Sequence, residues 1–343
     1  MNTLAVIVVN WNGLSDTVEC MNSILTQSHT GFTVFLADNA SSNSEFEELN
    51  LLFGSNPRVV LIRNAKNLGF GIAHNNLFEK QIEEGYKWVA LLNNDAVADR
   101  EWLNQALLAM EEHKADAVAC RMLQYHSPSL LDSAGLYMLN TGELLPRGHM
   151  QPAEKWTNTE PVIAFSGGAC LLKLDLIKEI GGFDPYFHTG YEDAELGLRA
   201  FLSGKKIIYE PRSVVYHKMG QSLAKDWNYR RTRKIILDSR YTWFKLMPWT
   251  VTALYAPLIL LRSLLILLVH LLAFRFRYIA VFFDAGYRFL RYDRARIARA
   301  RKTFFRRIGI RKILSMQVSF LKTDTQRFYR FFVKVKPTKF ERN

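Results

Sequence analysis

The first half of the chain alternates short runs of apolar residues with longer stretches in which apolar positions recur at helical spacing. The short apolar runs are Leu4–Asn10, Thr33–Ala37, Val59–Arg63 and Trp88–Leu92. The amphipathic stretches lie near residues 15–28, 45–53, 72–84 and 100–113. Because strands that are apolar throughout must be covered on both faces, this alternation predicts an α/β fold with a mostly parallel sheet between two layers of helices.

Polar clusters rich in asparagine and aspartate follow each of these strands. The clusters are Asn10-Trp11-Asn12, Asp38-Asn39-Ala40-Ser41-Ser42, Arg63-Asn64 and Asn93-Asn94-Asp95. The carboxyl ends of parallel strands meet at one edge of a sheet, and open α/β sheets bind their ligands there. A single cluster of this kind is ordinary turn chemistry, but several at one edge favour a polar ligand.

Two residues are candidate ligands of a hard cation. Asp95 follows an apolar strand among amides, and carboxylate oxygens are ligands that Mg²⁺ and Mn²⁺ prefer. His217 ends a last predicted strand, Ile207–His217. The alternative to cation binding at Asp95 is that this residue only forms a turn. The sequence lacks the GxGxxG, GK[ST] and GxSxG motifs, which argues against a dinucleotide-binding protein, a P-loop ATPase and an α/β-hydrolase.

A glycine pair and an acidic helix start follow further along the chain. Gly167 and Gly168 lie in the predicted strand Ala164–Leu172, where they let another group approach the backbone closely. Glu192 and Asp193 open a predicted helix, and complementing the helix dipole is the plain alternative to catalysis for them. Neighbouring residues on a helix point about 100° apart, so we expect only one of these carboxylates to serve as a general base.

Charge divides the chain into two unlike parts. Residues 1–217 hold 16 Lys and Arg against 26 Asp and Glu, whereas residues 218–343 hold 29 against 6. An acidic body with a basic tail favours attachment to an anionic surface. RNA is the weaker candidate, because no RNP, KH or OB motif accompanies the charge. The 3 cysteines are widely spaced and form no CxxC motif, which favours a reducing compartment.

The tail contains the strongly apolar segment Thr250–Phe274, interrupted by Pro257, Arg262 and His270. Arginine at a bilayer centre costs about 2.5–3.5 kcal/mol on insertion scales. Basic residues also flank the segment on both sides, so a single span would carry one basic flank across the membrane. We therefore expect an interfacial or shallow re-entrant helix pair, with a single span as the alternative. Residues 275–312 hold 13 Lys and Arg against 2 Asp, which predicts a helix that binds anionic lipid; a solvated helix packed on the body is the alternative.

Several motifs in a fixed order carry a resemblance to a known family. They are Val6–Asn12, Asp38–Ser41, Asn67–Phe70, Leu92–Asp95, Ser166–Ala169, Gly182–Asp184, Tyr191–Asp193 and His217. Together they make residues 3–225 resemble family 2 glycosyltransferases, and within that family the rhamnosyltransferase-like members of bacterial surface-polysaccharide and O-antigen biosynthesis. One position departs from the family pattern, because Asn93 stands where the DXD motif has its first aspartate.

The resemblance implies the GT-A fold, a Rossmann-like nucleotide-diphospho-sugar transferase fold, and an inverting, metal-dependent hexosyltransferase. The expected donor is a nucleotide-diphosphate sugar, with dTDP-rhamnose as the first guess, and the cofactor is Mn²⁺ or Mg²⁺. The expected acceptor is a lipid-linked oligosaccharide or polysaccharide.

The resemblance also gives each candidate residue a role. Donor binding falls to Asn10, Asn12, Asp38, Arg63, Asn64, Asn67, Asn93 and Asn94. Asp95 and His217 would hold the cation. Asp193 would be the catalytic base beside Glu192. The acceptor side would include Gly167, Gly168 and Asp184.

These observations predict a catalytic domain over residues 1–225 and a helical membrane-binding region over 226–343. We expect the protein at the cytoplasmic face of the bacterial inner membrane, as a peripheral or monotopic protein with an anionic membrane surface as partner and no nucleic acid. The alternative function is a non-catalytic membrane- or RNA-bound scaffold with a degenerate nucleotide-sugar fold. The presence together of Asp95, Asp193 and His217 argues against that alternative.

Overall fold

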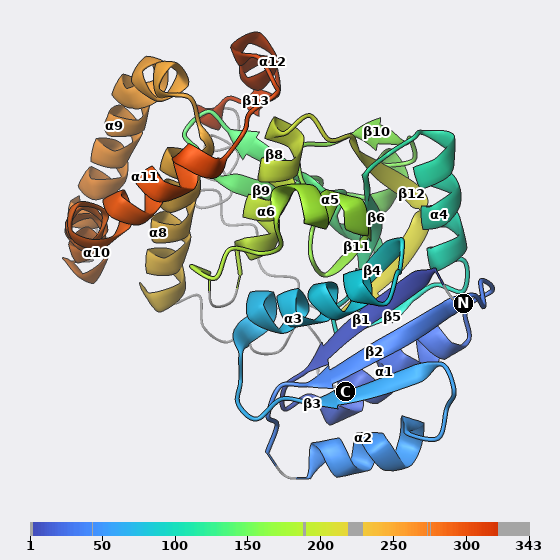
Figure 1. Cartoon of the computed structure of the whole chain (residues 1–343). Coiled ribbons are helices and arrows are strands. Elements are labelled where there is room, and N and C mark those ends of the chain that lie inside the picture. The colour runs from blue at the N-terminus through green and yellow to red at the C-terminus, as the bar shows by residue number, and fades with distance from the viewer. Residues whose placement is uncertain are drawn as a thin grey trace.

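The computed structural model describes residues 3–42, 44–187, 190–218, 229–272, 274 and 276–321. Figure 1 shows a sheet with helices on both faces and, beside it, a group of helices from the C-terminal part of the chain. The predicted boundary between residues 225 and 226 lies outside the described residues.

The main sheet is mostly parallel, as the sequence predicts. Its strands are β1 (Leu4–Asn10), β2 (Phe32–Asp38), β3 (Val59–Arg63), β4 (Trp88–Leu92), β6 (Ala117–Gln124), β10 (Glu160–Pro161), β11 (Ala169–Lys173) and β12 (Ile207–His217). They follow the order β10-β12-β6-β11-β4-β1-β2-β3. Neighbours from β4 to β3 are parallel, as are β12 and β6, whereas β11 runs antiparallel to both β4 and β6.

Two more strands complete this sheet. They are β5 (Ala96–Ala98), which pairs antiparallel with β12, and β7 (Ser127–Ser133), which pairs antiparallel with β6. The predicted strand Ala164–Leu172 is shorter in the structure, because Ala169 N donates to Ser166 O in a turn before β11 begins.

Helices cover both faces of the sheet, which confirms the prediction from the apolar strands. The helices are α1 (Leu14–Leu25), α2 (Glu45–Phe53), α3 (Gly69–Glu83), α4 (Trp102–Glu112), α5 (Leu174–Ile180) and α6 (Glu192–Leu202). Residues of α1, α2 and α4 share one apolar core, and residues of α3, α5 and α6 share the other. Side chains of β1 alternate between the two cores, since Leu4 and Val6 face the first whereas Ala5 and Ile7 face the second.

A second, small sheet lies next to α6 and the C-terminal helices (Figure 1). Its strands are β8 (Leu136–Leu139), β9 (Leu144–Pro146) and β13 (Gln317–Val318), in the order β13-β8-β9. A 3-10 turn, η1, follows at Ala153–Lys155. Because β13 pairs with β8, the chain beyond residue 300 returns to the body of the protein.

The C-terminal helices pack against the sheet domain. They are α8 (Tyr229–Leu246), α9 (Trp249–Leu272), α10 (Phe276–Arg288), the π-helix η2 (Phe289–Asp293), α11 (Arg294–Thr303) and α12 (Ile310–Ser315). Trp243, Leu246, Met247 and Val251 belong to the same core as α3, α5 and α6. Of the described helices, α9 alone is long and apolar enough to cross a membrane by length and composition.

Candidate active site

The polar clusters predicted at the strand ends meet at one edge of the sheet. Asn10 at the end of β1 pairs in register with Asp38 at the end of β2, and β4 lies on the other side of β1. Just beyond β4, Asn93 N donates to Gly168 O at 2.9 Å. This bond joins the loop after β4 to the turn that precedes β11.

The first cluster is built around Asn10, whose side chain is 0% exposed. Asn10 Nδ2 donates to Asp38 Oδ1 at 3.0 Å and to Glu45 Oε2 at 2.9 Å, and Asn10 Oδ1 accepts from Thr17 Oγ1 at 2.8 Å. Ser41 N donates to the other Asp38 oxygen, Oδ2, at 3.1 Å. Asn10 therefore orients Asp38 from within the protein. Glu45 was not among the predicted site residues, because no motif surrounds it.

The second cluster is built around Asn39, which is buried. Its Oδ1 accepts from Asn64 Nδ2 at 3.2 Å and from Leu68 N at 3.0 Å, and its Nδ2 donates to Asn67 Oδ1 at 3.0 Å. Asn39 thus fixes the loop before α3 with the two predicted donor-site residues Asn64 and Asn67. Asn39 belongs to one of the motifs, but no role was predicted for it.

The other predicted donor-site residues lie around these clusters. The Arg63 side chain is 57% exposed and pairs with Glu47 Oε1 at 2.7 Å. Asn12 Oδ1 accepts from Ser42 N at 2.8 Å, across the loops that follow β1 and β2. Asn94 Nδ2 donates to Thr17 Oγ1 at 3.0 Å, toward α1. Asn93 Nδ2 lies 3.5 Å from His217 Nε2.

The structure brings together the two predicted cation ligands. Ala96 of β5 pairs with His217 of β12, which places the turn after β4 beside the end of β12. His217 Nε2 lies 3.2 Å from Asp95 Oδ1, and its other ring nitrogen, Nδ1, lies 2.9 Å from Asp132 Oδ2. Burial alone would lower the pKa of His217, but hydrogen bonds and charges from Asp132 and Asp95 outweigh it and raise this pKa to about 10.

This donor set fits a hard divalent cation in part. A carboxylate oxygen and an imidazole nitrogen are suitable ligands for Mn²⁺ or Mg²⁺, and the contact of Nδ1 with Asp132 leaves Nε2 as the nitrogen that faces Asp95. No group of three or more His, Cys, Asp or Glu side chains within the described ranges could enclose a metal ion. The remaining ligands of a cation here would have to be oxygens of water and of a bound diphosphate.

The predicted base, Asp193, lies in the first turn of α6 against the glycine pair. Asp193 Oδ2 accepts from Gly167 N at 2.7 Å, and Asp193 Oδ1 accepts from Ala194 N at 2.7 Å. A Cβ atom on Gly167 would lie 3.1 Å from Asp193 Cβ and 3.2 Å from Phe70 Cζ. The group that approaches Gly167 is therefore Asp193, so Gly167 helps to position this carboxylate. The acceptor-side role expected of the glycine pair stays a prediction.

Glu192 differs from Asp193 in its surroundings. It is buried, and within the described part of the chain its Oε2 has no hydrogen-bond partner. Burial and the neighbouring Asp193 carboxylate raise the pKa of Glu192 above its usual range. Burial also raises the pKa of Asp193, although the N–H groups of Gly167 and Ala194 oppose part of that shift. Because Asp193 accepts these two hydrogen bonds and Glu192 Oε2 accepts none from the described residues, Asp193 is the carboxyl group of the pair whose charged form is better stabilised.

Asp184 faces the C-terminal helices instead of an open site. Its Oδ2 accepts from Tyr241 Oη at 3.0 Å and pairs with Lys245 Nζ at 2.5 Å, and its Oδ1 accepts from Tyr186 N at 2.9 Å. Both oxygens are thus engaged within the protein. These contacts give Asp184 a structural role between the loop before α6 and α8, and its acceptor-side role stays a prediction.

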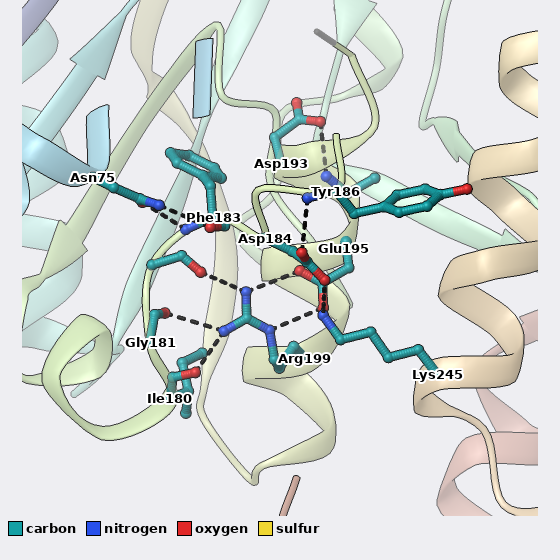
Figure 2. Close-up of polar contacts among 12 residues, drawn as sticks. Asn75, Ile180, Gly181, Phe183, Asp184, Tyr186, Asp193, Glu195, Arg199 and Lys245 are labelled. Atoms are coloured by element: carbon teal, nitrogen blue, oxygen red, sulfur yellow. Dashed lines mark hydrogen bonds and ion pairs between the residues drawn. The ribbon is translucent and has the colours of Figure 1, made fainter. Parts of the chain in front are cut away.

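Figure 2 shows the network of buried charges to which Asp184 belongs. Lys245 Nζ also lies 2.7 Å from Glu195 Oε1, and Arg199 donates to both oxygens of Glu195, from Nε and from Nη2, at 2.9 Å each. Arg199 further donates to the carbonyl oxygens of Ile180, Gly181 and Gly182. The network joins the end of α5, the loop before α6, α6 and α8. No pattern in the sequence predicted this network.

Two curated relatives are similar to about two thirds of the chain. The O-antigen biosynthesis protein RfbC of Myxococcus xanthus is 25% identical over 219 residues, which cover 60% of this chain and 16% of that protein. The N-acetylglucosaminyl-diphospho-decaprenol L-rhamnosyltransferase of Mycobacterium tuberculosis is 24% identical over 246 residues, which cover 64% of this chain and 79% of that enzyme. The chain therefore spans less than a fifth of RfbC.

Two solved structures share the fold. GalNAc-T7 with UDP, GalNAc and Mn²⁺ matches with a TM-score of 0.53 at 16% identity, over 71% of this chain and 50% of that one. The mannosyltransferase PcManGT from Pyrobaculum calidifontis, in complex with GDP-Man and Mn²⁺, matches with a TM-score of 0.52 at 16% identity. The match covers 84% of this chain and 87% of PcManGT. The fold is GT-A.

The family comparison covers most of the chain. Residues 2–235 match the model of the glycosyltransferase-like family 2, and this range contains both the Asp95–His217 pair and the Asp193 site. The chain therefore belongs to glycosyltransferase family 2.

Proposed function

We propose that this glycosyltransferase is an inverting enzyme in which Asp193 is the catalytic base and Asp95 and His217 hold a divalent cation. One observation carries the proposal: the Gly167-Gly168 turn contacts both halves of the site. Gly167 N donates to Asp193, and Gly168 O accepts from Asn93 N, two residues before Asp95. The base and the cation ligands are therefore held next to one turn.

The reaction is a single displacement. The acceptor hydroxyl oxygen forms a bond to the anomeric carbon of the donor sugar, while the bond from that carbon to the diphosphate oxygen breaks. Asp193 takes the proton of the attacking hydroxyl, which typically contributes about 10²–10⁴-fold to the rate. Inversion follows because attack and departure occur on opposite faces of the carbon.

When bound, Mn²⁺ or Mg²⁺ would neutralise negative charge on the leaving diphosphate. Asp95 and His217 would be its protein ligands. The clusters around Asn10 and Asn39 hold Asp38, Asn64 and Asn67 at the same sheet edge, where we assign them to the nucleoside and ribose of the donor.

The donor and acceptor are proposed from similarity. The mycobacterial relative is named for L-rhamnosyl transfer to N-acetylglucosaminyl-diphospho-decaprenol, and the relative from Myxococcus for O-antigen biosynthesis. We therefore take dTDP-rhamnose as the first donor to test, and a lipid-linked oligosaccharide or polysaccharide as the acceptor.

We also propose that the enzyme works as a peripheral or monotopic protein at the cytoplasmic face of the bacterial inner membrane. The α9 helix exposes the leucine side chains Leu254, Leu260, Leu261, Leu264, Leu265, Leu268, Leu271 and Leu272. Arg262, which would be costly in lipid, is 12% exposed because it pairs with Glu143 before β9 and lies over the Phe320 ring. One face of α9 thus contacts the body of the protein, which favours an interfacial helix over a single span.

The test is nucleoside-diphosphate release by the full-length protein in detergent. The donors are dTDP-rhamnose, UDP-hexoses, UDP-N-acetylhexosamines and GDP-mannose, each with Mn²⁺ or Mg²⁺ and then with EDTA. We expect turnover of one donor that EDTA and Asp95→Ala abolish. Asp193→Asn should lower kcat by about 10²–10⁴-fold, whereas the matched control Glu192→Gln should retain turnover, because the buried Glu192 carboxyl favours its neutral form.

The opposite pattern would overturn the base assignment: Asp193→Asn active and Glu192→Gln inactive. Because release without an acceptor can be slow, binding of each donor is followed in parallel by thermal shift. A protein that neither turns over nor binds any donor would support the alternative, a non-catalytic scaffold.

A further inference from the structure

The orientation of His217 depends on a carboxylate that belongs to neither the predicted motifs nor the proposed ligands. Asp132 lies on β7, and its Oδ2 is 2.9 Å from His217 Nδ1. The Asp132 side chain is buried beside the ring. We infer that Asp132 is a positioning residue, which holds the His217 ring so that Nε2 faces the cation site; this inference rests on the proposed function of His217 as a ligand.

The topology explains how Asp132 reaches His217. The strand β6 pairs with β11 along its first half and with β7 along its second, while β12 pairs with its other side. Gln124 of β6 pairs with His217, and Leu123 pairs with Leu131, the residue before Asp132. Asp132 and His217 therefore come from strands on opposite sides of β6. The register of all three strands sets their contact.

The contact between Asp132 and His217 decides which ring nitrogen can bind a cation. A cation at this site would take the place of the proton on Nε2, while the proton on Nδ1 stays donated to Asp132 and fixes the ring, so that the Nε2 lone pair points at the cation. Asp95 Oδ1 lies 3.2 Å from that same Nε2. Carboxylates that orient a ligating histidine in this way typically contribute 10–100-fold to metal affinity.

A second histidine contacts the same carboxylate from outside the site. His149 Nδ1 lies 3.3 Å from Asp132 Oδ1 and 3.1 Å from the Asp132 backbone oxygen. This contact uses the Asp132 oxygen that does not face His217. Replacement of His149 therefore disturbs Asp132 without removing its contact with His217, which makes His149→Gln a matched control.

The experiment measures Mn²⁺ binding by the full-length protein in detergent with dTDP, and in parallel with UDP, from the EPR signal of free Mn²⁺. We expect Asp132→Asn to raise the Kd for Mn²⁺ by about 10-fold and Asp132→Ala by up to about 100-fold. His149→Gln should change the Kd by less than about 3-fold. Nitrogen coupling to bound Mn²⁺, seen by electron spin-echo modulation, should be present in the unmodified protein and in His149→Gln, and reduced in both Asp132 variants.

Each failure can be told apart from the others. If the unmodified protein and His217→Ala bind Mn²⁺ equally, the proposed cation site itself is wrong. If His217→Ala loses Mn²⁺ but both Asp132 variants keep the affinity and the nitrogen coupling, the cation site stands and the positioning inference is overturned. Melting curves without metal identify a variant that is merely unfolded. Asp132→Asn, which preserves side-chain shape, then decides the result.

Discussion

Lys245 on α8 and Glu195 on α6 form a buried ion pair with 2.7 Å between Nζ and Oε1 (Figure 2). The Lys245 side chain is 8% exposed and that of Glu195 is 0% exposed. Glu195 lies two residues after Asp193 on the same helix. A cation from the C-terminal helices therefore compensates buried negative charge in the helix that carries the proposed base, so α8 is part of the structure that supports the catalytic domain.

Replacing Lys245 by Met should destabilise the protein strongly. The substitution leaves Asp184 without its cation and Glu195 with Arg199 alone. Removing one partner of a buried ion pair typically costs about 3–5 kcal/mol, because the remaining charge stays buried without compensation. The free energy of unfolding from urea titration at pH 7 measures the effect.

The control for this prediction is Lys178→Met. Lys178 pairs with Asp175 at 3.0 Å, but these side chains are 47% and 85% exposed. Exposed pairs contribute about 0–1 kcal/mol, so this variant should unfold almost as the unmodified protein does. Equal losses in the two variants would show that the buried network does not carry the stability that we assign to it.

Acid should weaken the same network. Burial would raise the pKa values of Asp184 and Glu195, but Lys245, with Arg199 at Glu195, outweighs burial and holds both pKa values below their usual ranges. A carboxylate whose pKa is lower in the folded state stabilises the protein above its unfolded pKa, and this stabilisation is lost as the pH falls through the folded pKa. We expect the urea midpoint of the unmodified protein to fall as the pH drops below about 4.5. The midpoint of Lys245→Met should fall less steeply with pH. If the midpoints of both proteins fell equally steeply, Lys245 would not be the group that lowers these two pKa values.

The sequence predicted the elements of the sheet well because their signal is local. Each strand from β1 to β4 is a short apolar run, and a run of this kind identifies a strand covered on both faces without any knowledge of its partners. The meeting of Asp95 with His217 could also be anticipated, because both were expected at strand ends on one edge of the sheet.

The residues that support the site could not be predicted in this way. Asp132 contacts His217 from 85 positions away, and Lys245 contacts Glu195 from 50 positions away. Such pairs depend on strand register and on helix packing, which leave no local pattern. The contacts of Asp184 could not be predicted for the same reason, because nothing near it in the sequence indicates that Tyr241 and Lys245 face it.

A methyl group on Gly167 should disturb catalysis more than folding. The new Cβ in Gly167→Ala would lie 3.1 Å from Asp193 Cβ and 3.2 Å from Phe70 Cζ, so Asp193 or the turn must shift by a few tenths of an ångström. Because a base must stay within hydrogen-bond reach of the proton that it takes, we expect kcat for nucleoside-diphosphate release to fall at least 10-fold, with KM for the donor little changed.

Gly286→Ala is the matched control, because a Cβ at Gly286 in α10 would have nothing within 4 Å. Alanine is also the better helix former there, so this variant should keep full turnover and an equal or higher melting temperature. A Gly167→Ala enzyme with unchanged kcat would show that Asp193 does not depend on the turn for its position.

Acidic residues on the exposed face of α9 should release the protein from membranes. Leu264 and Leu268 are 54% and 49% exposed and lie one turn apart. Burying a leucine side chain is worth about 1.5–3 kcal/mol, and the new carboxylates would be repelled by anionic lipid. We expect the double replacement by Glu to lower binding to vesicles of anionic phospholipid by at least 10-fold in a flotation assay. The control is Leu51→Glu on α2, where Leu51 is 84% exposed. It adds a carboxylate far from α9, so this variant should float as the unmodified protein does. If the double variant also floated like the unmodified protein, α9 would not be the membrane-binding surface.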